Sequence, residues 1–162
     1  PLEVYLTYAQ LAKKQRLYND GLQMLNKAEL RYKISKPIIL HRVELYQKLN
    51  NNAAVIKALN QALELDPKSI DVLHQLATIY IDINSRKSID LFKKLLVYPA
   101  YKDIALSSLG LLHTKLYQAD PGPNNRNNLV LALGYYNSYY KKHPQSKETK
   151  EMIDNIRFLL EP

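Results

Sequence analysis

Cysteine is absent from the 162 residues of the chain. Disulfides and thiolate metal sites are therefore excluded, and the absence fits either the cytoplasm or the periplasm and envelope of a bacterium. No apolar run approaches the ~18 residues that a membrane-spanning helix needs, so we expect no membrane insertion. The chain begins at Pro1 and shows no signal peptide. We therefore expect it to be a processed or partial chain, whose lack of a targeting signal says little about its compartment.

Known catalytic motifs are also missing. The sequence contains no G-x-S-x-G, H-E-x-x-H, P-loop or dinucleotide-binding fingerprint. We therefore predict a protein that is not an enzyme and that has no cofactor. Glycine is scarce, at 4 residues, and few runs alternate as strands do. The predicted fold class is all-α.

The formal net charge of +8 makes an acidic partner worth considering. The basic residues are spread along the chain, however, and the densest segment, 27–36, is interrupted by Leu30, Tyr32 and Ile34. A solvated basic surface is favoured over a dedicated polyanion site. Binding of nucleic acid is therefore disfavoured and stays a minor hypothesis.

Helical apolar stripes recur along the chain with a period of 34 residues. Tyr5, Ile39 and Leu73 share this spacing, and each opens the apolar stripe of a helix. Pro67 ends one helix, and Ser69 or Asp71 is expected to cap the next. The predicted repeats are 2–35, 36–69, 70–102 and 103–146, with an inserted loop at 118–128 and a capping helix at 147–160.

Small and large residues alternate on the packing faces of these predicted helices. Tyr8, for example, is placed on the stripe of the first helix, and His113 is expected to be a hydrogen-bonded core histidine. Ser146 is the expected N-cap of the last helix. This helix has one apolar face and a polar outer face, and a repeat array needs such a helix to cover the end of its core.

The unit resembles the tetratricopeptide repeat, which is a helix–turn–helix of 34 residues. The segment L-x2-L-A-x2-Y from Leu73 to Tyr80 and the segment ALELDP from Ala62 to Pro67 carry the resemblance most clearly. It implies one domain, an α-solenoid of four repeats with a capping helix. Arg42 and Val43 depart from the pattern, because the family has a large apolar and a small residue there.

The resemblance implies a scaffold or adaptor for protein–protein interaction, which binds a peptide or a helix of a partner in a concave groove. The first helix of each repeat would supply the groove's side chains. The predicted lining is Thr7, Gln10, Lys14, His41, Glu44, Lys48, Asp71, His74, Gln75, Thr78, Ser107, Ser108, Leu111 and Lys115. The structural alternative is that these residues form an ordinary solvated surface.

Family members that act as co-chaperones bind the C-terminal carboxylate of a heat-shock protein with Lys and Asn in the groove. The matching positions here are Leu6, Gln10, His41, Asp71 and Gln75. Because Asp71 would repel a carboxylate, a heat-shock-protein C-terminus is disfavoured as the partner.

Three further hypotheses remain open. The inserted loop, together with a secondary surface of Tyr135 and Tyr140, would contact a partner, although a core role for the tyrosines is favoured. The last hairpin weakly resembles repeat lipoproteins of bacterial outer-membrane assembly. The segment HPQS and the terminal helix are the basis of this resemblance. His41, Glu44 and His74 would form a zinc site in the least favoured alternative. The oligomeric state is not indicated.

Overall fold

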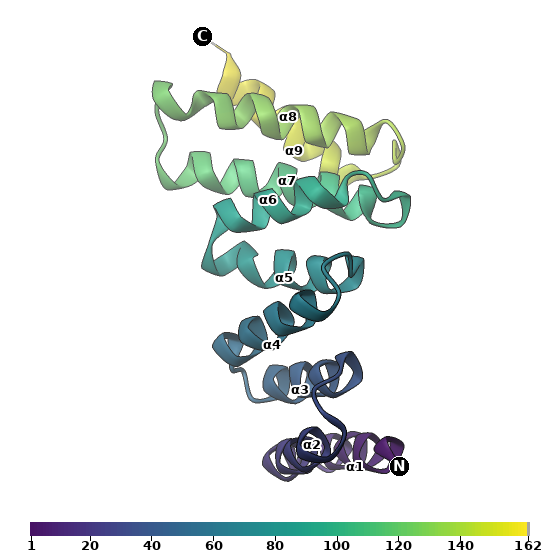
Figure 1. The fold of residues 1–162 in the computed structure, drawn as a ribbon. Coiled ribbons are helices and arrows are strands. Elements are labelled where there is room, and N and C mark those ends of the chain that lie inside the picture. The colour runs from purple at the N-terminus through teal and green to yellow at the C-terminus, as the bar shows by residue number, and fades with distance from the viewer. Residues whose placement is uncertain (162) are drawn as a thin grey trace. The chain divides into compact units, whose positions relative to one another are not determined.

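The computed structural model describes residues 1–161, and within this range all regular structure is helical (Figure 1). The predicted all-α fold class is confirmed. The helices are α1 (Leu2–Lys14), α2 (Tyr18–Tyr32), α3 (Lys36–Lys48), α4 (Asn52–Leu65), α5 (Ile70–Ile83), α6 (Ser85–Leu95), α7 (Pro99–Ala119), the short 3-10 helix η1 (Pro123–Asn125), α8 (Arg126–Tyr140) and α9 (Lys147–Leu160).

Two compact units divide the chain, an N-terminal unit of residues 1–76 and a C-terminal unit of residues 77–162, and the division falls inside α5. In the N-terminal unit, α1 and α2 form one antiparallel pair and α3 and α4 the next (Figure 1). No helix among residues 1–161 is long and apolar enough to cross a membrane. The organisation as one domain of four repeats stays a prediction.

Several helix ends follow from local sequence chemistry. The side chains of Asn51, Asn84 and Ser146 accept hydrogen bonds from backbone N–H groups in the first turns of α4, α6 and α9. The predicted cap at Ser146 is therefore confirmed. Helix α4 ends at Leu65, two residues before Pro67, as predicted. Helix α5 begins at Ile70, which places Asp71 in the first turn of the helix rather than at its cap.

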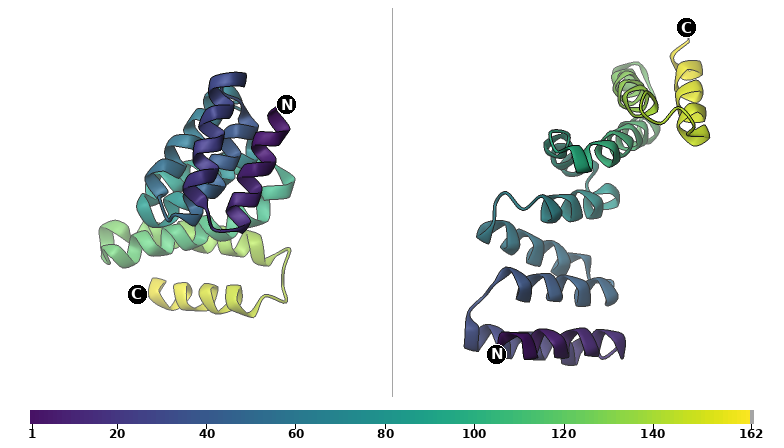
Figure 2. Two further views of the ribbon diagram at one scale, coloured as in Figure 1. Left: turned by 90° about the horizontal axis from the view of Figure 1, so that it is seen from below. Right: turned by 90° about the vertical axis from the view of Figure 1, so that its right-hand side faces the viewer.

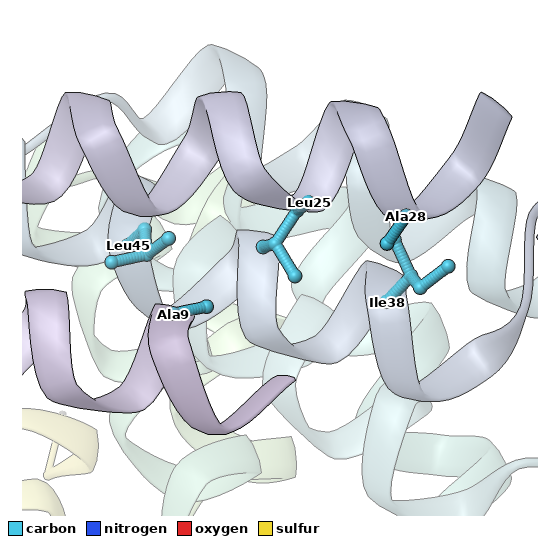
Figure 3. Packing of buried hydrophobic residues seen from close by; sticks show 5 residues of the cluster. All are labelled: Ala9, Leu25, Ala28, Ile38 and Leu45. Carbon is cyan, nitrogen blue, oxygen red and sulfur yellow. The ribbon is translucent and has the colours of Figure 1, made fainter. Parts of the chain in front are cut away.

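One cluster in the core of the N-terminal unit is made by α1, α2 and α3. Figure 3 shows Leu25 and Ala28 of α2 beside Ile38 of α3, with Ala9 of α1 and Leu45 of α3 completing the cluster. All five side chains are buried. Small residues let the helices approach and large ones fill the adjoining space, as the sequence pattern predicts.

The core of the C-terminal unit contains a second cluster, where α8 meets α9. Leu129, Ala132 and Tyr136 of α8 are buried against Ile153 and Ile156 of α9. Figure 2 shows α9, the yellow helix, running alongside α8. The apolar face predicted for the last helix is thus the face that packs.

Two predictions differ from the structure. Residues 118 and 119 extend α7, and residues 126 to 128 begin α8, so the inserted loop is shorter than the predicted 118–128. The Asn125 amide closes this loop by donating to both the backbone oxygen and Oδ2 of Asp120, at 3.0 and 2.7 Å. Tyr8, placed on a packing stripe, is 40% exposed, because it lines a surface cavity beside Val4 and Met24.

Candidate peptide-binding surfaces

Polar groups of α1 and α3 pair with each other on the predicted groove face of the N-terminal unit. The Nδ1–H of His41 donates to the backbone oxygen of Pro37, with 2.8 Å between Nδ1 and the oxygen. Nε2 of His41 is then an acceptor, and it receives the Nε2–H of Gln10 across 3.1 Å. Both imidazole nitrogens are therefore occupied, and the ring is held in one orientation.

A second link between these helices was not predicted. Lys13, which was not among the predicted groove residues, forms an ion pair with Glu44. The pairs Gln10–His41 and Lys13–Glu44 both span 31 residues, which is one helical turn less than the repeat period. That spacing is the one sequence feature that the two links share. Lys14 is left exposed.

Exposure separates the remaining predicted groove residues of this unit. Thr7, Lys48 and Asp71 are exposed, whereas His74 and Gln75 are half-buried. Burial lowers the pKa of His74, and the nearby negative charge of Asp71 opposes that shift. His74 therefore favours its neutral form on this surface.

The zinc alternative gains no support. Residues 1–161 contain no group of three or more His, Asp or Glu side chains placed to hold a metal ion. In addition, the lone pair of His41 that would bind the metal already accepts from Gln10.

In the C-terminal unit, three predicted groove residues line one cavity. It has a volume of about 320 Å³ and lies between α7, α8 and α9. Its lining is Ser107, Ser108, Leu111, Tyr136, Tyr139, Ser146, Glu148, Thr149 and Met152. The other two predicted groove residues of the unit lie outside the lining: Thr78 is exposed, and Lys115 is paired with Asp82 at 2.8 Å.

Sequence reasoning missed the contribution of α9 to this cavity. Glu148, Thr149 and Met152 lie on a helix that was expected only to cap the core. Spacing supplies the signal in retrospect: Thr149 and Met152 are one turn apart, so they present the same side of α9. The predicted packing residue Tyr136 also reaches the lining.

Most hydrogen-bonding groups around the cavity are already used within the protein. Ser107 donates to the backbone oxygen of Ile104 at 3.1 Å, and Ser146 pairs with Thr149 at 2.9 Å. The Ser108 hydroxyl has no such partner within residues 1–161. Glu148 is exposed and is the one charged side chain of the lining. The cavity thus offers an apolar wall, a free hydroxyl and a single carboxylate.

The predicted secondary tyrosines are both half-buried. Tyr135 stacks on His113, with ring centroids 5.7 Å apart, and Tyr140 packs against the core cluster between α8 and α9. These contacts agree with the favoured core role of the two side chains. Their use as a contact surface stays a prediction.

His113 is the hydrogen-bonded core histidine that the sequence predicts. It is 5% exposed, and its Nδ1–H donates to Oδ1 of Asn128 at 2.9 Å. Nε2 of the same ring has no partner within residues 1–161. Burial lowers the pKa of His113, and the charge of Lys93 adds to the effect, while the Asn128 hydrogen bond opposes it. The side chain is therefore a neutral, structural imidazole.

The helical fold is that of the tetratricopeptide repeat, and comparison with solved structures confirms the predicted resemblance. A tetratricopeptide repeat protein from Parabacteroides merdae matches 98% of this chain with a TM-score of 0.70 at 16% sequence identity. The chain spans 59% of the length of that protein.

Two further structures show the same similarity. The MamA protein matches 98% of this chain and 87% of its own, with a TM-score of 0.70 and 14% identity. A thermophilic tetratricopeptide repeat protein from Thermus thermophilus matches 98% of this chain and 82% of its own, with a TM-score of 0.57 and 16% identity. At these identities the likeness shows the fold. Comparisons with protein-family models and with curated protein sequences find no match.

Proposed function

We propose that the chain is a non-catalytic scaffold for protein–protein interaction, which binds a peptide or a helix of a partner on the face presented by the first helices of its repeats. The fold supports this class of function, because arrays of stacked helical hairpins offer extended surfaces for binding. The observation that carries the proposal is the cavity between α7, α8 and α9. Three residues chosen from the repeat register, Ser107, Ser108 and Leu111, line it.

The side chains of this cavity restrict the kind of peptide segment that can bind there. Leu111, Met152 and the Tyr136 ring supply apolar surface, which suits one apolar side chain of a bound segment. Glu148 brings a negative charge, and no lysine or arginine belongs to the lining. A segment with a basic residue next to an apolar one therefore fits better than an acidic segment.

The N-terminal unit has a predicted groove face of its own, with different chemistry. Gln10, His41 and Glu44 are engaged with neighbouring side chains, so they would contribute a fixed polar surface. Thr7, Lys14 and Lys48 are exposed and would be the adaptable contacts. Neither group resembles a carboxylate clamp, and a heat-shock-protein C-terminus remains disfavoured as the partner.

Two matched leucines allow a direct test. Leu111 lines the cavity and is 39% exposed, whereas Leu131 on α8 is 38% exposed and lies outside the lining. Peptides selected from a random displayed library would be titrated, by fluorescence polarisation, against the wild type, Leu111→Lys and Leu131→Lys. We expect Leu111→Lys to weaken binding by about tenfold or more, because it removes apolar contact and repels a basic ligand.

Leu131→Lys should bind as the wild type does, and both variants should keep the wild-type melting temperature. Equal affinity of the two variants for the selected peptides would remove the cavity from the proposal. If the library yields no peptides that compete with one another for this surface, the result would count against peptide binding by the protein.

The loop between α7 and α8 supports a second candidate site. A cavity of about 390 Å³ lies beside the loop and is lined by Arg86, Leu116, Ala119, Asp120, Asn125 and Asn128. In this alternative a partner, such as a component of an envelope assembly, contacts the loop and not the groove face. Replacing 121–124 with a short glycine–serine turn would abolish binding in this alternative and leave it intact in the first.

A further inference from the structure

A third cavity of the C-terminal unit combines aliphatic and basic residues. It has a volume of about 650 Å³ and lies where α6 ends, α7 begins and α8 ends. Its lining is Leu96, Val97, Lys102, Leu106, Ser138, Lys141 and Lys142, none of which belongs to the cavity proposed above for the groove peptide.

The aliphatic side of this cavity is open to solvent. Val97, in the connection between α6 and α7, is 76% exposed, while Leu106 of the same lining is only 6% exposed. Leu96 is half-buried. A bound apolar side chain would cover Val97 and complete the packing around it.

The charge of the lining is entirely positive. Lys142 is paired with Asp103 at 2.9 Å, and His143 holds the other carboxylate oxygen of Asp103 at 3.0 Å. Lys102 and Lys141 are exposed, and neither forms an ion pair within residues 1–161. Two uncompensated ammonium groups therefore border the aliphatic floor.

Helix stability does not account for all three lysines. Lys141 and Lys142 follow the end of α8, where a cation complements the helix dipole. Lys102, by contrast, is the fourth residue of α7, close to the positive end of its helix, where a cation is unfavourable. The dipole of α7 therefore does not explain Lys102, whose ammonium group is available to an anion at this cavity.

The remaining lining residues restrict the kind of anion. The Ser138 hydroxyl donates to the backbone oxygen of Gly134 at 2.8 Å, so it offers no free proton to a ligand. None of the lining residues is aromatic, and single-stranded nucleic acid needs aromatic platforms on which its bases stack. A volume of this size suits one or two apolar side chains of a ligand.

We propose that this cavity binds an acidic segment of a partner protein, with an aliphatic or aromatic side chain seated against Leu96, Val97 and Leu106 and carboxylates facing Lys102 and Lys141. This site is separate from the groove-face cavity and has the opposite charge preference, because Glu148 is the charged group there. The chain would then bind two chemically different segments.

The probe is an array of short fluorescein-labelled peptides, in which Asp and Glu flank a Leu or Phe residue at varied spacing. Two companion sets replace the apolar residue with Ser or the acidic residues with Lys. We expect binding only by peptides with both features, and a loss of about tenfold or more in Lys102→Glu/Lys141→Glu. Affinity should fall with added salt without vanishing, because the apolar contact is not screened.

Lys147→Glu/Lys150→Glu is the matched control, since it makes the same charge change at two exposed residues of α9. This control and Leu111→Lys should each keep the affinity within about twofold. Equal losses in the two double-glutamate variants would show a response to net charge alone. Binding by the Ser peptides, by an oligonucleotide or by anionic vesicles in place of the acidic–apolar peptides would also overturn the proposal, as would binding by no member of the array.

Discussion

A Cβ atom at Gly110 of α7 would lie 2.7 Å from Cε1 of Tyr136 on α8 and 2.8 Å from two further atoms of that ring. Side chains do not tolerate contacts this short. Tyr136 is 6% exposed and is packed between α7 and α9, apart from the part of the ring that borders the cavity described above. The ring therefore rests directly on the backbone of α7, and glycine is the residue that permits this approach.

Replacing Gly110 with alanine should destabilise the protein by about 1–3 kcal/mol, because the core must shift to admit a methyl group. Helix propensity acts in the opposite direction by roughly 1 kcal/mol and reduces the net effect. Urea unfolding monitored by circular dichroism measures the difference. A Gly110→Ala variant that is more stable than the wild type would contradict the close packing.

Gly134 in α8 is the matched control. Apart from the adjoining residues and the local helix backbone, no atom lies within 4 Å of a Cβ atom placed there, and the residue is exposed. Gly134→Ala should therefore stabilise the protein by about 0.5–1 kcal/mol, through the lower entropy of the unfolded chain and the better helix propensity. The two substitutions, although chemically identical, should change stability in opposite directions.

Arg16 and Asn50 occupy equivalent left-handed positions after α1 and α3, with φ angles of 63° and 54°. In both places the following N–H donates back into the helix: Leu17 to Ala12 at 2.8 Å and Asn51 to Tyr46 at 2.9 Å. This is the Schellman ending, in which glycine or asparagine is preferred. Asn50 meets that preference and Arg16 does not.

Arg16→Gly should therefore raise the free energy of unfolding by roughly 0.5–1 kcal/mol, since it removes the steric cost of a left-handed side chain. Gln15→Gly, one residue earlier, should give no gain, because φ there is −84°. Thermal melts of the two variants beside the wild type test this. A gain for Gln15→Gly as large as that for Arg16→Gly would contradict the steric explanation, because glycine otherwise destabilises a protein by raising the entropy of the unfolded chain.

Periodicity predicted the helices and most of the packing residues because those depend on a regular alternation along the chain. Ile39, for instance, opens one of the predicted stripes and is fully buried. The prediction that Tyr8 packs in the core was wrong. A stripe predicts which side of a helix is apolar, and it does not predict whether a neighbouring helix covers that side. The predicted loop was too long, because hydrogen bonds from the Asn125 side chain to Asp120 close a shorter loop, and sequence composition does not predict such bonds.

The candidate site was predictable only in part. Ser107, Ser108 and Leu111 follow from the register of the repeat, since they share one side of α7. The links Lys13–Glu44 and Arg42–Glu29 depend on distances between helices and on side-chain rotamers, which the repeat period does not specify. The lysine-lined cavity gathers three helix ends, and residues near helix ends carry no periodic signal.

Burial of His113 makes stability sensitive to acid. Because its pKa is lowered in the folded protein, the unfolded chain, with a pKa of about 6.5, takes up a proton more readily. The stabilising contribution is therefore present above about pH 6.5 and is lost as the pH falls below that value. His74, whose pKa is also lowered, should contribute in the same direction.

His113→Phe should flatten the dependence of the melting temperature on pH between about 7.5 and 5.5, because it removes the titrating group and keeps a ring against Tyr135. The wild type should lose stability over the same interval. His113→Phe/His74→Gln should flatten the profile further. An unchanged slope in the single variant would show that His113 does not titrate between the folded and unfolded states.

Arg42 stands where the repeat has an apolar residue. Its buried side chain forms an ion pair with Glu29 and donates a hydrogen bond to Oδ1 of Asn26 at 2.7 Å. Arg42→Ala should lower the free energy of unfolding by about 1–3 kcal/mol, because it leaves an unfilled space and removes the donor to Glu29 and Asn26. The exposure of Glu29 limits this loss, since water can hydrate its carboxylate. Arg42→Leu restores the apolar pattern of the repeat and should cost less than about 1 kcal/mol. Chemical unfolding of both variants decides between packing and charge. If leucine is as costly as alanine, the ion pair with Glu29, and not the filling of the space, is what Arg42 contributes to the N-terminal unit.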